Sequence, residues 1–131
     1  MKTLIVEDDF TSRLIMQKII SPFGETHLAA DGEEAMEAFR MAREEKRPYD
    51  LICLDIMMPK MNGHEVLAAI RKIEEEDGID ELDRVKIVMT TAIDNPEDAI
   101  NTINGQCDAY LTKPIDKEKM LVQLVSLGIL I

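Results

Sequence analysis

Residues 50–63, "DLICLDIMMPKMNG", place a carboxylate directly after an apolar run. The run Leu51–Leu54 is continuously apolar, which is typical of a strand buried on both faces of a parallel sheet. The next residues include Pro59 and Asn62-Gly63, which favour a loop that ends in a turn. Asp55 lies at the junction, so the sequence predicts an ionisable group at the end of a buried strand. A helix cap or a solvated loop residue would be the simplest explanation if Asp55 stood alone.

The same pattern, a short apolar segment followed by a longer amphipathic one, occurs five times in the chain. Strands are expected at Thr3–Val6, Thr26–Ala30, Leu51–Leu54, Lys86–Thr90 and Ala109–Leu111. Helices are expected at Thr11–Ile20, Glu33–Glu45, Gly63–Glu75, Pro96–Asn104 and Lys117–Leu127. Because parallel strands need crossover connections, five such units predict an α/β fold, with one parallel sheet covered by helices on both faces. The 131 residues are the size of one domain.

Turn and capping residues agree with these boundaries. Thr11 or Ser12 is expected to cap the first helix. Asp31 and Asn62, each followed by glycine, are expected to turn the chain into the second and third helices, and Asp94-Asn95-Pro96 into the fourth.

Composition restricts the partners. The net charge is −11, from 26 acidic and 15 basic residues, and aromatic residues are scarce, which argues against binding to nucleic acid. No apolar stretch reaches the ~18–20 residues of a membrane span, and no signal segment is present, so a cytoplasmic location is expected. Cys53 and Cys107 are interpreted as small buried side chains rather than as a disulfide or a metal pair. The expected partner is another protein or a cation.

Polar side chains follow four of the five predicted strands. They are Glu7-Asp8-Asp9 after the first strand, Asp55 after the third, Thr90-Thr91 after the fourth and Thr112-Lys113 after the fifth. Each has an ordinary explanation by itself, because an acidic triplet favours a helix dipole and a lysine is usually a surface residue. In a parallel sheet, however, the carboxyl ends of the strands meet at one edge, where ligands bind.

Grouped carboxylates need a neutralising partner. Two carboxylates about 4 Å apart repel by roughly 4 kcal/mol at an effective dielectric constant near 20. Such a cluster therefore binds a cation or takes up a proton. Oxygen ligands without histidine or cysteine suit Mg²⁺, which shares its sites with phosphoryl groups. A carboxylate nucleophile, a hydroxyl and a lysine beside Mg²⁺ together indicate phosphoryl transfer.

These residues stand in four short motifs: "LIVEDD" at 4–9, "LDIMMPKMNG" at 54–63, "TA" at 91–92 and "DAYLTKP" at 108–114. Together, and in this order, they closely resemble the receiver domain of two-component response regulators, over essentially the whole chain 1–131. The resemblance implies a single domain with a flavodoxin-like, doubly wound sheet of strand order 2-1-3-4-5 and five helices.

The resemblance also implies roles for individual residues. Asp55 would accept a phosphoryl group from a sensor histidine kinase or a histidine phosphotransfer protein. Asp8 would bind Mg²⁺ directly, Glu7 mainly through water, and Met57 through its backbone carbonyl. Thr91 would move to bond the phosphoryl oxygen, Tyr110 would change rotamer with it, and Lys113 would pair with the phosphoryl group. Lys113-Pro114 would be a cis peptide.

The sequence departs from the family pattern at a few positions. Glu7 stands where the family often has aspartate, and Gln106 stands where it commonly has glycine. Asp9 is interpreted as a helix-entry residue rather than a ligand. Met57 and Ile93, which flank the site, are hypothesised to restrict the water that hydrolyses the acyl phosphate.

The expected output is a contact with another protein. Phosphorylation is expected to repack a face made of the segments 96–104, 109–111 and 117–127. The chain ends soon after that last segment, so we expect a stand-alone receiver, a monomer or weak homodimer, that acts by protein contact, as in chemotaxis, or by phosphorelay. An Mg²⁺-dependent phosphohydrolase with an aspartyl nucleophile is the alternative. That class typically has an aspartate where this chain has Met57, which argues against it.

Overall fold

The computed structural model of the protein describes residues 1–58, 60–92 and 107–130. Its strands are β1 (Lys2–Val6), β2 (Glu25–Ala29), β3 (Leu51–Asp55), β4 (Lys86–Thr91) and β5 (Ala109–Thr112). Its helices are α1 (Phe10–Ile20), the short 3₁₀ helix η1 (Ser21–Phe23), α2 (Gly32–Glu44), α3 (Gly63–Glu76) and α5 (Lys117–Ser126). The helix expected at 96–104 lies outside the described residues, together with Ile93 and Gln106.

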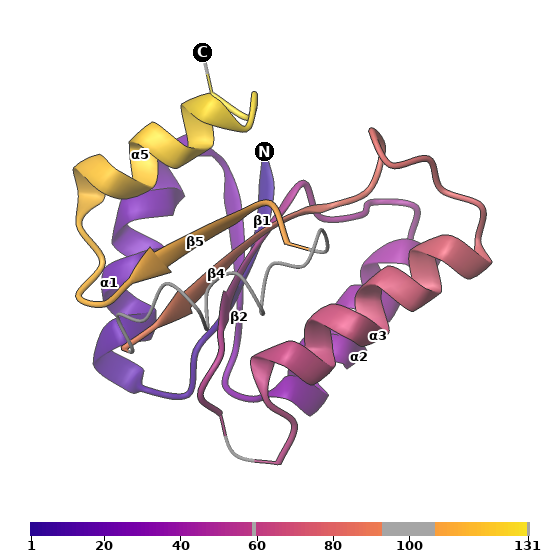
Figure 1. The fold of residues 1–131 in the computed structure, drawn as a ribbon, viewed down its shortest axis with the longest axis horizontal. Coiled ribbons are helices and arrows are strands. Elements are labelled where there is room, and N and C mark those ends of the chain that lie inside the picture. Colours follow the sequence, from indigo (N-terminus) through magenta and orange to yellow (C-terminus); the bar gives the residue numbers. More distant parts are fainter. Residues whose placement is uncertain (59, 93–106, 131) are drawn as a thin grey trace.

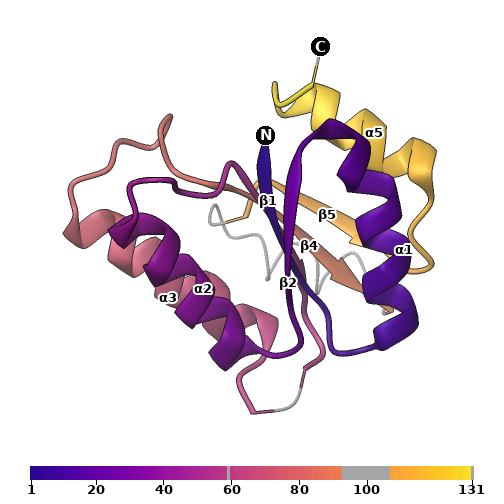
Figure 2. The ribbon, with the colours of Figure 1, turned by 180° about the vertical axis from the view of Figure 1, so that it is seen from behind.

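The five strands form one parallel sheet in the order β2-β1-β3-β4-β5. The helices α1 and α5 cover one face of this sheet, and α2 and α3 cover the other (Figures 1 and 2). The predicted α/β fold and strand order are therefore confirmed. In this order the connections that follow β1 and β3 run to opposite faces of the sheet, which leaves a crevice between the carboxyl ends of these two strands.

The sheet divides the apolar core into two layers because neighbouring side chains of a strand point to opposite faces. The layer beneath α2 and α3 contains, among others, Leu4, Val6, Phe39, Ile52, Leu54, Leu67, Ile70 and Met89. The layer beneath α1 and α5 contains, among others, Ile5, Ile20, Leu51, Cys53, Val88, Leu111, Met120 and Leu124. The inner strands β1, β3 and β4 are buried on both faces, as their continuous apolar runs predict, whereas the edge strand β2 is exposed or half-buried over most of its length.

In the described part of the chain, four acidic or amide side chains cap the α-helices: Asp9, Asp31, Asn62 and Asp116. Asp31 and Asn62 cap α2 and α3, and Asn62 forms a reciprocal capping box with Glu65. The prediction for α1 is wrong, because its cap is Asp9 rather than Thr11 or Ser12. The Asp9 carboxylate accepts a hydrogen bond from the Ser12 amide at 2.8 Å, so the helix begins earlier than expected.

A buried ionic network joins α3 to the amino ends of β4 and β5. Arg71 donates to Glu74 at 2.7 Å, to Asp108 at 3.0 Å and to the Val85 carbonyl at 2.8 Å. Glu74 accepts from the Val85 amide, and Asp108 from the Ile87 amide. Every charge in the network has a partner, which is the condition under which buried charges are tolerated.

Both cysteines are buried free thiols, as predicted. Burial raises the pKa of Cys53 to about 12, so this thiol is protonated at neutral pH. None of the helices in the described part of the chain is long and apolar enough to cross a membrane.

Candidate functional site

Three carboxylates meet at the carboxyl ends of β1 and β3. Glu7 and Asp8 directly follow β1, and Asp55 is the last residue of β3. One oxygen from each lies within 4.8 Å of the others. Glu7 and Asp55 are 5% and 1% exposed, whereas Asp8 is exposed and marks the side on which the cluster meets solvent. The expectation that these strand ends bring the carboxylates together is confirmed.

Lys113, which follows β5, supplies the positive charge of the site. Its ammonium lies 2.7 Å from Glu7 Oε2 and 3.4 Å from Asp55 Oδ1. Burial opposes the charged form of Lys113, but the hydrogen bond to Glu7 and the charges of Asp55 and Glu7 outweigh it and raise its pKa. The lysine is therefore protonated and bridges the two buried carboxylates.

Asp55 is the carboxylate with the most perturbed acidity. Burial and the neighbouring charge of Glu7 raise the pKa of Asp55 to about 7, although Lys113 opposes the shift. The Met57 amide donates to Asp55 Oδ1 at 3.2 Å. A carboxylate whose pKa is raised by burial and by a neighbouring negative charge is one that a bound cation would stabilise in its ionised form.

Thr91 and Tyr110 lie on the α2–α3 side of the sheet. Thr91 is the buried last residue of β4, and Tyr110 packs against the core layer beneath α2 and α3. In the register of β4 and β5, Tyr110 pairs with Met89, and Met89 precedes Thr91 by two residues along β4. The Lys113 amide donates to the Thr91 carbonyl at 2.7 Å, which ties the ends of β4 and β5 together. The Lys113-Pro114 peptide is cis.

The loop after Asp55 approaches the strand so closely that glycine is required at position 63. A Cβ on Gly63 would lie 2.4 Å from the Asp55 carbonyl oxygen and 2.7 Å from the Ile56 Cα. Ile56 donates to the Thr90 carbonyl and Gly63 to the Ile56 carbonyl. The loop therefore closes back on β3 and fixes the position of Asp55. Pro59 lies outside the described residues.

Two supporting residues were missed in the sequence. Arg13 of α1 donates to the Glu7 carbonyl at 2.9 Å, and Lys60, in the left-handed region with φ 65°, lies 3.8 Å from Asp31. Asp9, by contrast, is a helix cap outside the carboxylate cluster, as interpreted from the sequence. Arg13 comes four residues after Asp9, which is one helical turn into α1. This spacing was the signal in the sequence that could have placed its side chain near the start of the helix and the Glu7 backbone.

The donors fit Mg²⁺. In the part of the chain that the structure describes, the cluster offers carboxylate oxygens alone, which are the hard ligands that this ion prefers. The exposed carboxylate of Asp8 leaves room for the water molecules that Mg²⁺ retains. Glu7, Asp8 and Asp55 are the residues that would hold the ion.

Comparison with known families finds a match over most of the chain. The family model described as "Response regulator receiver domain" matches residues 3–125. A rice protein named "Probable histidine kinase 2" is 33% identical over 92% of this chain and 12% of its own length. "Probable transcriptional regulator ycf27" of Cyanophora paradoxa is 33% identical over 96% of this chain and 47% of its own length. The chain thus spans at most about half the length of these relatives.

Solved structures show the same likeness in three dimensions. The chemotaxis protein CheY4 of Vibrio cholerae has a TM-score of 0.79 and 28% identity, covering 96% of this chain and 97% of that protein. The receiver domain of the Francisella response regulator 1452 has a TM-score of 0.74 and 26% identity, with coverages of 96% and 94%.

Proposed function

Because this chain belongs to the response regulator receiver domain family, we propose that Asp55 accepts a phosphoryl group from a phosphohistidine of a partner protein. The observation that supports this most directly is the group of Asp55, Glu7, Asp8 and Lys113 at one sheet edge, with Lys113 3.4 Å from Asp55. A carboxylate, a cation site and an ammonium in contact are what phosphoryl transfer requires.

The proposed transfer forms one bond and breaks one. An oxygen of the ionised Asp55 carboxylate attacks the phosphorus, and the P–N bond of the phosphohistidine breaks. The electron pair of that bond goes to the imidazole nitrogen, which then takes up a proton. Hydrolysis reverses the modification: water attacks the phosphorus, the P–O bond to Asp55 breaks, and inorganic phosphate leaves.

The other site residues would act on charge. Bound Mg²⁺ would neutralise the phosphoryl oxygens and the Glu7–Asp8–Asp55 cluster. Lys113 would pair with the phosphoryl group, and the backbone carbonyl of Met57 would complete the ion's ligands. Thr91 would bond a phosphoryl oxygen, and Tyr110 would follow the movement of Thr91.

The proposed output is a changed protein-binding face. Phosphorylation adds roughly −1.5 to −2 charges and three acceptor oxygens at Asp55. Lys113, now held by Glu7, would be drawn toward this new charge, and β4 and β5 would respond because Lys113 and Thr91 are hydrogen-bonded. The proposed face is the one expected from the sequence, with segment 96–104 outside the described residues; of the two described elements, β5 and α5, α5 exposes Val122 and Val125. Its target would be a protein and not DNA; a cytoplasmic location stays a prediction.

The phosphodonor would dock beside α1. Phe10, Leu14 and Ile15 are exposed apolar side chains on this helix, and Phe10 directly follows the acidic residues of the site. A histidine kinase or a histidine phosphotransfer protein that covered these side chains would hold its phosphohistidine near Asp55.

Labelling tests the proposal. The chain is incubated with Mg²⁺ and acetyl phosphate or a phosphoramidate, and the mass is measured. Wild type is expected to gain one phosphoryl group and Asp55→Asn none. Asp9→Asn is the matched control, because it removes a neighbouring carboxylate yet keeps a good cap, and it is expected to label normally. Equal labelling of Asp55→Asn would disprove the site, and no labelling of wild type by these donors or by histidine kinases would disprove the function.

The phosphohydrolase alternative predicts a different result. Position 57, two residues after Asp55, holds a methionine that is 59% exposed and provides no acid or base. Turnover of unrelated phosphomonoesters by the chain, measured as released phosphate, would favour that alternative over the phosphoacceptor.

A further inference from the structure

The loop after β3, residues 56–63, is closed at its base. The Gly63 amide donates to the Ile56 carbonyl at 3.0 Å, and the Ile56 amide donates to the Thr90 carbonyl of β4 at 2.9 Å. Met57 follows Ile56 and carries the backbone carbonyl proposed above as a ligand of Mg²⁺. Because the two ends of the loop are joined to each other and to the sheet, a shift at its far side has to be taken up by the residues between them, Met57 included.

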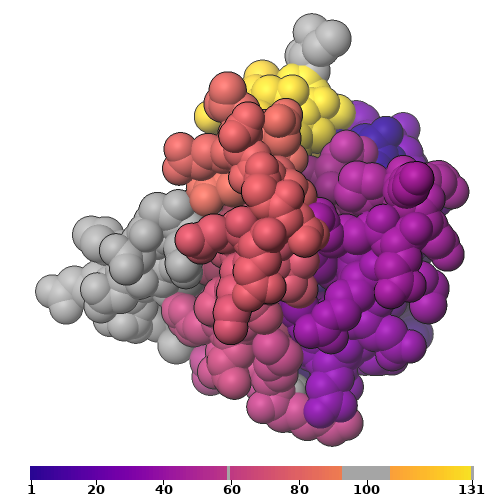
Figure 3. All heavy atoms as spheres, turned by 90° about the vertical axis from the view of Figure 1, so that its right-hand side faces the viewer, coloured from indigo at the N-terminus to yellow at the C-terminus, as the bar shows by residue number. Residues whose placement is uncertain are grey.

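The far side of this loop rests on the first turn of α2. Figure 3 shows the two segments in contact, the loop in pink and the start of α2 in purple. The contact is made at Gly32, the first residue of α2, where a Cβ would lie 2.5 Å from the Met61 carbonyl oxygen and 2.7 Å from the Met61 Cβ. Gly32 lies outside the left-handed region, and alanine is the better helix former. The close approach of Met61 is therefore the physical reason for glycine at this position.

The start of α2 is itself held firmly. Asp31 caps the helix and accepts from the Glu34 amide at 2.9 Å, and the Glu34 carboxylate accepts from the Ala30 amide at 2.6 Å. The next turns are anchored in the core by three side chains that are at most 4% exposed: Ala35, Met36 and Phe39. A methyl group at position 32 would therefore displace the loop rather than the helix.

Lys60, the residue before Met61, adds a second constraint. Its φ of 65° lies in the left-handed region, which is uncommon for a residue other than glycine. Its ammonium lies 3.8 Å from Asp31 Oδ2 and 3.9 Å from Glu33 Oε2, at the same end of α2 that contacts Met61. These ion pairs are exposed and contribute little stability by themselves. Their position shows that the loop leans on α2 in this left-handed conformation.

We propose that Gly32 and Lys60 are positioning residues, which hold the loop so that the Met57 carbonyl completes the magnesium site. This role rests on the proposed function, whose metal site it refines, and neither residue belongs to the carboxylate cluster. Contact with α2 fixes the far side of the loop, and the closed base passes this constraint on to Met57, whose amide donates to Asp55 Oδ1 at 3.2 Å. Replacing residues that orient a metal ligand typically weakens metal binding by roughly 10–100-fold.

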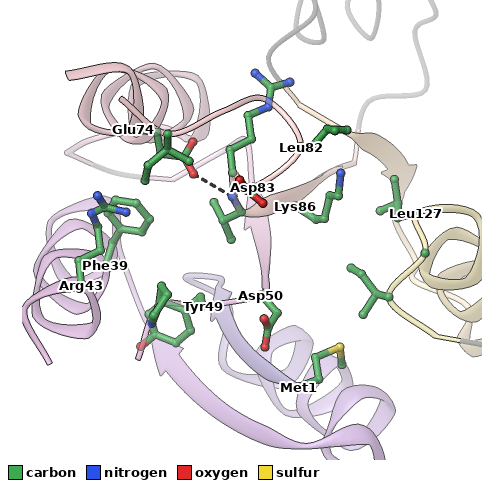
Figure 4. Close-up of a pocket in the computed structure, with 16 residues that line it drawn as sticks. Met1, Phe39, Arg43, Tyr49, Asp50, Glu74, Leu82, Asp83, Lys86 and Leu127 are labelled. Atoms are coloured by element: carbon green, nitrogen blue, oxygen red, sulfur yellow. Dashed lines mark hydrogen bonds between the residues drawn. The ribbon is translucent and has the colours of Figure 1, made fainter. Parts of the chain in front are cut away.

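Magnesium binding, measured by isothermal titration calorimetry, tests this role without any phosphorylation. Each variant of the full chain is titrated with Mg²⁺ at a temperature at which urea unfolding shows it to be folded. Gly32→Ala is expected to weaken Mg²⁺ binding about tenfold. Gly128→Ala is the matched control and is expected to leave the affinity unchanged. Gly128 follows α5 at the opposite end of the sheet, next to Leu127 in a groove of about 600 Å³ (Figure 4), and a Cβ there would meet nothing within 4 Å.

Position 60 provides a second test that does not depend on the folding of Gly32→Ala. Lys60→Val and Lys60→Asn both remove the exposed ammonium, so they change the charge near the loop equally. They differ in the backbone, because asparagine tolerates the left-handed region and a β-branched residue does not. Lys60→Val is expected to bind Mg²⁺ severalfold more weakly than Lys60→Asn. In ¹⁵N NMR spectra without metal, the Met57 amide of Lys60→Val should also shift, because the loop has moved.

The outcomes separate this inference from the proposed function. If wild type binds Mg²⁺ and both Gly32→Ala and Lys60→Val bind it equally well, the positioning role is overturned. Equal losses in Lys60→Val and Lys60→Asn would assign the effect to charge, and a loss in Gly128→Ala as large as in Gly32→Ala would assign it to stability; either result overturns the role as well. All of these results leave the phosphoacceptor proposal standing, since labelling of Asp55 tests it separately. No Mg²⁺ binding by wild type would overturn the metal site itself and this inference with it.

Discussion

Lys113 lies closer to Glu7 than to Asp55, the residue proposed as the phosphoacceptor, at 2.7 Å against 3.4 Å. The ammonium is thus held chiefly by the residue that stands where the family often has aspartate. The longer glutamate side chain brings its carboxylate into direct contact with the lysine. In this arrangement the lysine supplies positive charge to two buried carboxylates at once.

Replacement of Lys113 by methionine is therefore expected to make folding depend on Mg²⁺. The variant leaves Glu7 and Asp55 buried without their cation, and about 2 kcal/mol of unfolding free energy should be lost in EDTA, since the lysine is partly exposed. Mg²⁺ should restore most of this loss, because it binds the folded state. Urea unfolding with and without Mg²⁺ measures both values. The expectation would be contradicted if Mg²⁺ raised the unfolding free energy of the variant by no more than it raises that of wild type.

Asp8→Asn should separate metal binding from folding. Asp8 is exposed, so its replacement is expected to change the unfolding temperature in EDTA by little. The rise in that temperature on addition of Mg²⁺ should largely disappear, because the residue proposed as a direct ligand is lost. Asp9→Asn, one residue along, should keep the full rise. Equal responses of the two variants in a thermal-shift titration would show that Asp8 is not a ligand.

Gly63→Ala should destabilise the protein by about 2–3 kcal/mol, because the new methyl group would collide with the Asp55 carbonyl and the Ile56 Cα. Gly128→Ala is the comparison: its Cβ would meet nothing within 4 Å, and only the left-handed backbone costs about 1 kcal/mol. Chemical denaturation ranks the two variants. If Gly63→Ala cost less stability than Gly128→Ala, the loop after β3 would be able to move and accommodate the methyl group.

Arg71→Met should cost about 3–5 kcal/mol, because it leaves Glu74 and Asp108 buried without their shared cation. Lys72→Met, at the exposed neighbouring position of α3, should change stability by less than about 0.5 kcal/mol. Both are measured by equilibrium unfolding in urea. A loss at position 71 as small as that at position 72 would mean that the network contributes little.

Thr3→Val should stabilise the protein by about 1 kcal/mol. Within the described part of the chain, Thr3 Oγ1 is buried and has no hydrogen-bond partner, and valine has the same shape without the unsatisfied hydroxyl. An increase in the urea midpoint with an unchanged slope would agree with this reading. A decrease would indicate that the hydroxyl is satisfied in solution.

The sheet could be predicted from the apolar runs of its strands, and the carboxylate cluster from the residues that follow those strands. Continuous apolar runs identified the buried strands, and parallel order then brought Glu7, Asp55 and Lys113 to one edge. The predicted cap of α1 was wrong because Thr11 and Ser12 were both plausible caps, although Asp9 was already interpreted as a helix-entry residue. The Arg71 network was missed because it combines residues distant in sequence, whose meeting depends on packing. The functional roles of Asp55, Thr91, Tyr110 and Lys113 remain predictions.

The two-layer core has a consequence for how the protein tolerates change. Because the strands separate the layer under α2 and α3 from the layer under α1 and α5, side chains in one layer rarely touch those in the other. Destabilising effects of substitutions on opposite faces should therefore simply add. Substitutions under one pair of helices should then leave the packing of the other pair unchanged, while the five-stranded sheet between them keeps Asp55 in place.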